Sequence, residues 1–192
     1  MTNRRIIVFS TGLFLAVLLA IIIGVVEQGR HDYAQNIAVK ACVWIIYTFA
    51  EIKYGIEIKR YIRVFVMTVI VSDSFLGLYL DLYATSMIFD KIQHIFGSYA
   101  YSLFAYNLIC QLTQPTISRT FRFIFVLSLG LSVGALYEIG EFIGDQIVKP
   151  KVPSQPSLLD TDLDLIADVI GSLIAAVHAT TILSINCKRR AE

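Results

Sequence analysis

Charged residues are scarce in this sequence, and their scarcity excludes whole classes of protein. Asp, Glu, Lys and Arg together make up 16% of the chain, whereas 56% of its residues are hydrophobic. Soluble domains carry more charge than this, so the composition is typical of a protein whose helices cross a bilayer. The formal net charge is +1, and no basic stripe with interleaved aromatic residues occurs, so nucleic-acid binding is not expected.

Cysteines and prolines are few as well. The three cysteines, Cys42, Cys110 and Cys187, form no pair with the spacing of metal ligands. Two of them lie within apolar segments, so we expect free thiols that pack as small apolar groups. The four prolines are confined to two connections between apolar segments, where a helix must end. They are Pro115 in one connection and Pro150, Pro153 and Pro156 in the other.

Long apolar runs make up most of the remaining sequence. A helix needs about 20 mainly apolar residues to cross the hydrocarbon of a bilayer. We therefore predict an all-α, multi-pass membrane protein, a bundle of about six helices that forms one transmembrane domain over residues 1–192. The expected spans are 5–26, 36–50, 61–83, 88–112, 121–148 and 160–185. The first span is too long for a signal peptide and lacks a cleavage pattern, so we expect a retained anchor.

The basic residues are divided unevenly between the two predicted sides of the membrane. Eleven lie in the ends and loops of one side and four on the other, while Lys40 lies within a span. Cytoplasmic loops carry the excess of Lys and Arg, so both termini are predicted to be cytoplasmic. The expected location is the inner (cell) membrane, and the expected partner is membrane lipid. The sequence does not indicate which proteins, if any, bind to it.

Acidic residues gather at one end of the later spans. With cytoplasmic termini, the third and fifth spans end, and the fourth and sixth begin, at the outer membrane face. The polar residues of these ends are Asp81, Asp90, His94, Glu138, Glu141, Asp145, Asp160, Asp164 and Asp168. Many are three or four residues apart, so they share faces of their helices. A carboxylate within a span is costly and by default marks a functional site.

Carboxylates gathered in this way repel one another and need a cation, shared protons or a base. Bases are few on this side, and we expect most of them to be solvated; they are Lys91, His94, Lys149 and Lys151. The sequence therefore predicts a divalent-cation site or shared protons. The candidate metal ligands are His94, Glu138, Glu141, Asp164 and Asp168, with Asp90, Asp160, Asp81 and Tyr137 as supporting polar residues. A mixed set of histidine and carboxylates suits zinc, manganese or iron, whereas carboxylates alone suit magnesium or calcium.

Several of these residues also have a purely structural interpretation. Asp160 and Asp162 suit the first turn of a helix, where acids cap free N–H groups. Asp90 can cap its helix or lie at the membrane interface, and His94 can be a histidine that serves helix packing. These alternatives remain open on the sequence alone.

Other polar or small residues of the spans have similar alternatives. Asp73 lies in the middle of the third span, where it either extends the line of polar residues from the outer face or has a structural role. His178 is expected to form a hydrogen bond between helices. Tyr83 is a possible hydrogen-bond donor to the acids. Gly130 and Gly134 are spaced for close helix packing.

Three ordered segments resemble the YjdF-type family of bacterial inner-membrane proteins. They are Phe89–His94, with an Asp-basic-Ile-x-His element; Leu136–Phe142, with Tyr-Glu-x-x-Glu; and Asp160–Gly171, with Asp-Thr-x-x-Asp-x-x-x-Asp before a glycine. The resemblance covers about the last two-thirds of the chain. It implies a multi-pass membrane protein with shared positions at Asp90, His94, Glu138, Glu141, Asp160, Asp164 and Asp168. The chain is also similar, more loosely, to VanZ-like membrane proteins. Neither resemblance implies a stated activity.

Three functions are compatible with these features. The first is a metal-binding membrane enzyme that acts on a lipid or polyprenyl substrate at the outer leaflet, where a metal can activate water or bridge phosphate oxygens. The second is a small transporter or channel for protons or cations. The third is a structural or accessory membrane protein whose acids pair internally. No known hydrolase motif or outer arginine cluster supports the first.

Overall fold

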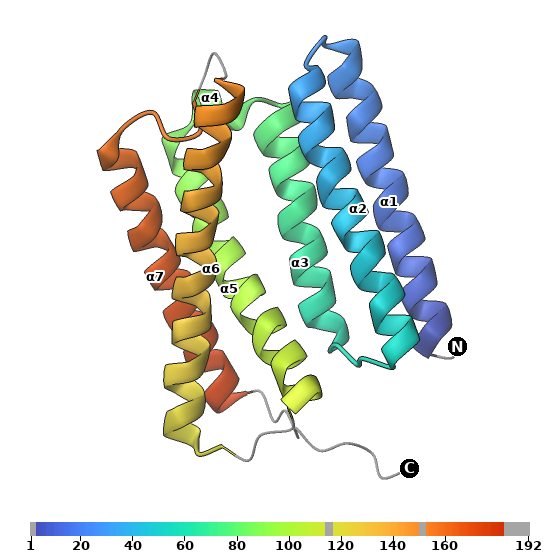
Figure 1. The fold of residues 1–192 in the computed structure, drawn as a ribbon, viewed down its shortest axis with the longest axis vertical. Helices are drawn as coiled ribbons and strands as arrows, with labels where there is room; N and C mark the ends of the chain where they lie inside the picture. Colours follow the sequence, from blue (N-terminus) through green and yellow to red (C-terminus); the bar gives the residue numbers. More distant parts are fainter. Residues whose placement is uncertain (1–2, 114–116, 150–152, 183–192) are drawn as a thin grey trace. The chain divides into compact units, whose positions relative to one another are not determined.

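The computed structural model describes residues 3–113, 117–149 and 153–182, which form helices and short connections without a strand (Figure 1). In chain order the helices are α1 (Asn3–Glu27), α2 (His31–Tyr54), α3 (Arg60–Ser72), the π-helical segment η1 (Asp73–Tyr79), α4 (Leu82–Thr85), α5 (Met87–Thr113), α6 (Arg119–Val148) and α7 (Leu158–Thr181). The predicted all-α fold is confirmed. Pro115, Pro150, Cys187 and the end of the sixth predicted span lie outside the described residues.

Within the part of the chain that the structure describes, four helical stretches are long and apolar enough to cross a membrane: Arg4–Glu27, Arg60–Tyr79, Arg119–Val148 and Leu158–Thr181. α2 and α5 are comparable in length but carry more polar side chains. Each of the six predicted spans corresponds to a helix, with α3 and η1 together in place of the third. The number of helices that cross the membrane and the side of each terminus stay predictions.

α2 is longer than the predicted span 36–50, because it runs for 24 residues from His31 to Tyr54. Lys40 does not shorten the helix, since its ammonium group pairs with Asp73. The helix ends at Gly55, whose φ of 65° is easily adopted only by glycine. The N–H of Gly55 donates to the backbone oxygen of Glu51, which caps the helix.

The chain divides into two compact units. Unit 1 comprises residues 1–57 and 67–85, and therefore holds α1, α2, the second part of α3, η1 and α4. Unit 2 comprises residues 58–66 and 86–192, and therefore holds the first part of α3 with α5, α6 and α7. The single transmembrane domain stays a prediction.

Unit 1 is held together by close packing of α1 on α2 and on η1. Phe14 of α1 packs on Trp44 of α2 with ring centroids 5.4 Å apart. Where α1 meets η1, Gly24 leaves space for the ring of Tyr79, because a Cβ on Gly24 would lie 2.7 Å from that ring. Figure 1 shows α1 and α2 side by side along most of their length.

A buried ion pair joins α2 to η1 within unit 1. Asp73, the first residue of η1, is 6% exposed and accepts hydrogen bonds from Lys40 Nζ and, at 3.0 Å, from the Tyr83 hydroxyl. Gly77 lets Tyr83 come close, since a Cβ on Gly77 would lie 2.2 Å from the tyrosine ring. The predicted hydrogen bond from Tyr83 to an acid is therefore present, and it serves Asp73.

In unit 2, α7 packs on both α5 and α6. Glycines permit the close approach. A Cβ on Gly130 would lie 2.2 Å from the hydroxyl oxygens of both Ser102 and Ser172, and one on Gly171 would lie 2.1 Å from that of Ser98. The expected role of Gly130 in close helix packing is confirmed, and polar side chains fill the space that the missing Cβ atoms leave.

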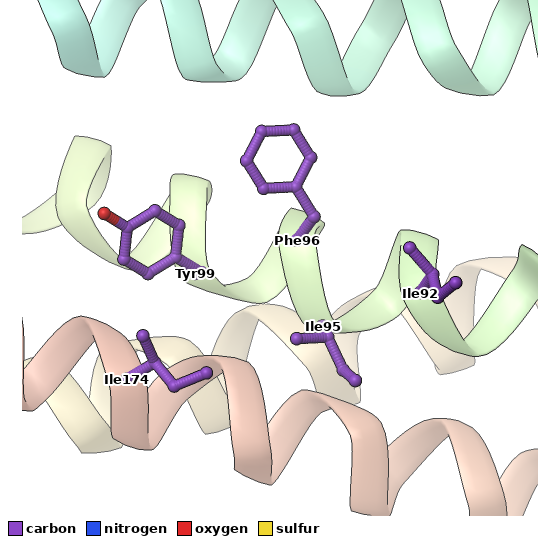
Figure 2. A pocket seen from close by; sticks show the side chains of 5 residues that line it. All are labelled: Ile92, Ile95, Phe96, Tyr99 and Ile174. Carbon is purple, nitrogen blue, oxygen red and sulfur yellow. The ribbon is translucent and has the colours of Figure 1, made fainter.

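An apolar hollow of about 270 Å³ lies on α5 and α7 of unit 2 (Figure 2). Its lining residues are Ile92, Ile95, Phe96, Tyr99 and Ile174. The Tyr99 hydroxyl lies 2.6 Å from Nδ1 of His178, so the predicted hydrogen bond of this histidine between helices is confirmed. None of the lining side chains carries a charge, and none of the acidic residues of the unit lines the hollow.

Candidate metal centre

The first polar side chains of the site come from the beginning of α5. Asp90 and His94 are one turn apart, so they face the same direction. His94 is only 6% exposed, so this polar side chain is buried within a largely apolar helix. Ser86 precedes the helix and its hydroxyl accepts a hydrogen bond from the N–H of Phe89 at 3.2 Å, which fixes the first turn.

α7 contributes an aspartate on each of three successive turns. Asp160, Asp164 and Asp168 are 8%, 2% and 3% exposed, so all three lie on the packed face of the helix. Asp160 lies in the first turn of α7, as its structural interpretation expects, but it is not the N-cap: Ser157 is, and its hydroxyl accepts from the N–H of Asp160 at 3.1 Å. The carboxylate of Asp160 is thereby left for the site. Asp162 is exposed and takes no part.

α6 supplies Glu138 and the space for a neighbouring carboxylate. Glu138 is 5% exposed, and its Oε1 makes no hydrogen bond among the described residues. One turn earlier, Gly134 faces Asp168 so closely that a Cβ on the glycine would lie 2.3 Å from Asp168 Oδ2. Gly134 therefore does more than let two helices approach, because its missing side chain makes room for an acid of the site.

His94 lies between two pairs of carboxylates. Its Nε2 is 3.5 Å from Asp164 Oδ1 and 3.8 Å from Asp90 Oδ1. Its Nδ1 is 3.4 Å from Asp168 Oδ1 and 3.7 Å from Glu138 Oε1. Two sets of three potential metal ligands result, and the ligand atoms of each set lie within 4.8 Å of one another. We call Asp90, His94 and Asp164 the outer set, and His94, Glu138 and Asp168 the inner set.

Lys91 neutralises part of this charge and is therefore not one of the solvated bases expected on this side. Its Nζ lies 3.0 Å from Asp90 Oδ2, 2.7 Å from Asp160 Oδ1 and 2.7 Å from Asp164 Oδ1. The side chain is 19% exposed. Three carboxylates from two helices thus hold one ammonium group, which compensates the outer set and leaves the inner set without a lysine or arginine within 4.0 Å among the described residues.

Gln155, in the connection between α6 and α7, also belongs to the site and was not predicted. Its side-chain Nε2 donates to Glu138 Oε2 and to the backbone oxygen of Glu138, both at 2.8 Å. The backbone N–H groups of Ser154 and Gln155 donate to the two carboxylate oxygens of Asp145, at 3.0 and 2.9 Å. No motif marks this glutamine in the sequence, since it is one polar residue in a loop containing prolines.

Three further predicted site residues belong to neither the outer nor the inner set. Glu141 is half-buried and belongs to neither ligand set. Asp81 belongs to unit 1, where its carboxylate pairs with Arg30 at 2.5 Å. Tyr137 is 47% exposed, and its ring makes a T-shaped contact with that of His94, with centroids 5.5 Å apart.

The cluster holds more negative than positive charge. Five carboxylates take part, and Lys91 with His94 supplies at most two positive charges. The carboxylates are those of Asp90, Glu138, Asp160, Asp164 and Asp168. Buried acid in such excess is stabilised by a bound cation or by protons.

Comparisons with known proteins agree with a membrane location and give no activity. The model of a family described as predicted membrane protein (DUF2238) matches residues 8–184, so the chain belongs to this family. An uncharacterized protein of Thermotoga maritima is 30% identical over 125 residues. That alignment covers 65% of this chain and 64% of the relative, which is less than two-thirds of the relative's length. No solved structure matches the chain.

Proposed function

We propose that this member of the DUF2238 family of predicted membrane proteins binds a divalent cation at the inner set, through His94 Nδ1, Glu138 Oε1 and a carboxylate oxygen of Asp168. One observation carries the proposal. Glu138 Oε1 is buried without a hydrogen bond and lies 3.7 Å from His94 Nδ1, on the side where Asp168 also approaches. An unpaired carboxylate oxygen in such a place is costly unless a cation or a proton binds there.

The inner set is favoured over the outer set because of Lys91. Asp164 already accepts from this lysine at 2.7 Å, and Asp90 at 3.0 Å. A cation at the outer set would have to displace the ammonium group or share its ligands with it. At the inner set no lysine or arginine competes among the described residues, and the cation would displace only the proton through which His94 Nδ1 pairs with Asp168 Oδ2 at 3.4 Å.

The surroundings of His94 suit a metal ligand. With a cation on Nδ1, the proton of the neutral ring is on Nε2, which faces Asp164 and Asp90. Histidine ligands of metals usually donate their other N–H to a carboxylate, which fixes the tautomer and makes the ring more basic. The outer carboxylates would therefore orient the histidine and need not bind the cation themselves.

The donor atoms indicate the class of cation. One imidazole nitrogen with two carboxylates suits zinc, manganese or iron better than magnesium or calcium, which favour oxygen ligands alone. Three protein ligands would leave a position for water or for a substrate oxygen. Such a centre can activate water or bridge phosphate oxygens, so we favour a reaction on a lipid or polyprenyl phosphate, with the site at the outer face of the cell membrane and both termini in the cytoplasm.

The resemblances to the YjdF-type family and to VanZ-like proteins remain part of this proposal. They agree with a multi-pass membrane protein and add no activity of their own.

Transport of the cation, or of protons, is the second candidate. Small buried polar side chains lie beyond the site on the same helix faces. Ser98 and Ser102 follow His94 on α5 at four-residue spacing, and Ser172 follows Asp168 on α7. Ser172 is fully buried and its hydroxyl makes no hydrogen bond among the described residues. Uptake of Mn²⁺ or of protons into proteoliposomes along a gradient would favour transport. If neither ion is taken up while the protein still binds metal, the result favours a metal-dependent enzyme over a transporter.

Titration calorimetry of the purified full chain, treated with a chelator and exchanged into detergent, tests cation binding directly. We expect saturable binding of Mn²⁺ or Zn²⁺ at one ion per chain. Glu138→Gln and Asp168→Asn should each weaken it by at least about 100-fold, since loss of even an outer partner of a metal ligand costs 10–100-fold. Asp162→Asn, a change at an exposed acid of the same helix, is the matched control.

Absence of saturable binding in the unaltered protein would contradict the proposal. If the same substitutions then lowered thermal stability, the acids would serve assembly alone, as expected of a structural or accessory membrane protein.

A further inference from the structure

We infer that Gln155 is a positioning residue of the cation site: it holds one oxygen of the Glu138 carboxylate so that the other faces the ion. This inference rests on the proposed function, and it concerns a loop residue that neither ligand set contains. The two oxygens of Glu138 have different surroundings. Oε2 accepts from Gln155 Nε2 at 2.8 Å, whereas Oε1 makes no hydrogen bond and faces His94.

The orientation of the glutamine side chain follows from its partners. Both atoms near its Nε2 are acceptors, the backbone oxygen and Oε2 of Glu138, so this end of the amide must be the NH₂ group. The NH₂ group spans the backbone and the carboxylate of one residue. It therefore fixes the rotation of the Glu138 carboxylate relative to its own helix, which a single contact would not achieve.

Gln155 is itself held from α6. Its backbone N–H donates to Asp145 Oδ2, and the neighbouring N–H of Ser154 donates to Asp145 Oδ1. Asp145 and Glu138 are two helical turns apart on the same helix, so the connection is attached to α6 at two points along one face. The helix that carries the ligand thus also carries the residue that orients it.

The amide suits this role because it has no charge. A lysine or arginine here would donate the same hydrogen bond but would neutralise Glu138, as Lys91 neutralises the outer acids. A neutral donor fixes the geometry and leaves the negative charge available to the cation. Outer partners of this kind commonly change metal affinity by about 10–100-fold.

Binding of Co²⁺ to the full chain in detergent tests this inference, because the visible absorption of bound Co²⁺ reports the geometry of its ligands. The test variants are Gln155→Met, which keeps the length of the side chain without a donor, and Gln155→Glu, which places a second acceptor against Glu138. Ser154→Ala is the matched control, since Ser154 contributes only its backbone N–H.

We expect both Gln155 variants to bind Co²⁺ about 10–100-fold more weakly, with a changed visible spectrum, while Ser154→Ala behaves as the unaltered protein. Thermal unfolding of the metal-free proteins should differ little between the Gln155→Met variant and the control, so a structural role alone would not give this result. Unchanged affinity and spectrum in both Gln155 variants would overturn the inference and leave the proposed function intact. Absence of Co²⁺, Mn²⁺ and Zn²⁺ binding in the unaltered protein would overturn both.

Discussion

Units 1 and 2 both bury carboxylates among apolar helices, but they balance the charge differently. In unit 1 Asp73 meets one lysine, Lys40, and a tyrosine hydroxyl. In unit 2 five carboxylates share Lys91 and His94. A matched pair satisfies itself within the protein, whereas an excess of buried acid requires a cation or a proton from outside. The acid of unit 1 therefore serves to pair two helices, whereas the acids of unit 2 have negative charge left over for a ligand.

The largest expected effect is in unit 1. Lys40→Met should lower the free energy of unfolding by about 3 kcal/mol, because it leaves Asp73 buried without its base. Denaturant unfolding in detergent measures this. Adding Asp73→Asn should recover most of the loss, and metal binding should be unchanged throughout. If these substitutions abolished metal binding, the distinction between the two units would be wrong.

Gly134→Ala should displace the Asp168 carboxylate from the inner set by a steric clash. The new Cβ would meet Asp168 Oδ2, so we expect a loss of about 1–3 kcal/mol in the free energy of unfolding, with weaker metal binding. Gly140→Ala is the matched control, because no atom lies within 4 Å of its Cβ position. The control should be neutral or more stable by up to about 1 kcal/mol, since alanine is the better helix former. Equal behaviour of the two variants would refute the role given to Gly134.

Lys91→Gln should increase the excess of negative charge in unit 2, because it removes the ammonium group that balances part of it. We expect divalent cations to bind about tenfold more tightly, or a second ion to bind, because the carboxylates of Asp160 and Asp164 would lose the ammonium group they now share. Calorimetry gives both affinity and stoichiometry. Lys149→Gln, at an exposed lysine that caps α6, should change neither. Weaker binding in Lys91→Gln would show that the lysine supports the site and does not compete with the ion.

The smallest expected effect is that of Tyr83→Phe. The substitution removes one hydrogen bond to Asp73 and keeps the ring that packs on Gly77. A loss of about 1 kcal/mol in the free energy of unfolding is expected, since Lys40 would still pair with the carboxylate. A loss as large as that of Lys40→Met would mean that the tyrosine, rather than the lysine, holds the pair together.

Much of the helical fold could be predicted from hydrophobic runs. The predicted span 88–112 corresponds to α5 at Met87–Thr113, and the span 121–148 to α6 at Arg119–Val148. The turn to π-helix at Asp73 could not be predicted, because Asp73 pairs there with Lys40, which lies 33 residues earlier in the chain.

The candidate site was predictable where it depends on helical spacing. Residues four apart on α5 and α7 do converge on His94. Glu141 does not join the ligand sets, because three residues after Glu138 the helix has turned partly away. Lys91 and Gln155 were missed for a common reason: a lysine near the membrane surface and a loop glutamine are usually solvated, and only the tertiary structure brings acceptors to them.

Crystals of the full chain soaked in Mn²⁺ would show whether the inner set binds the cation, through the anomalous scattering of the metal. We expect one strong peak, bounded by His94 Nδ1, Glu138 and Asp168, and its loss in Glu138→Gln but not in Asp73→Asn. A peak beside Asp73, or none within reach of His94 in crystals that bind Mn²⁺ elsewhere, would contradict this expectation.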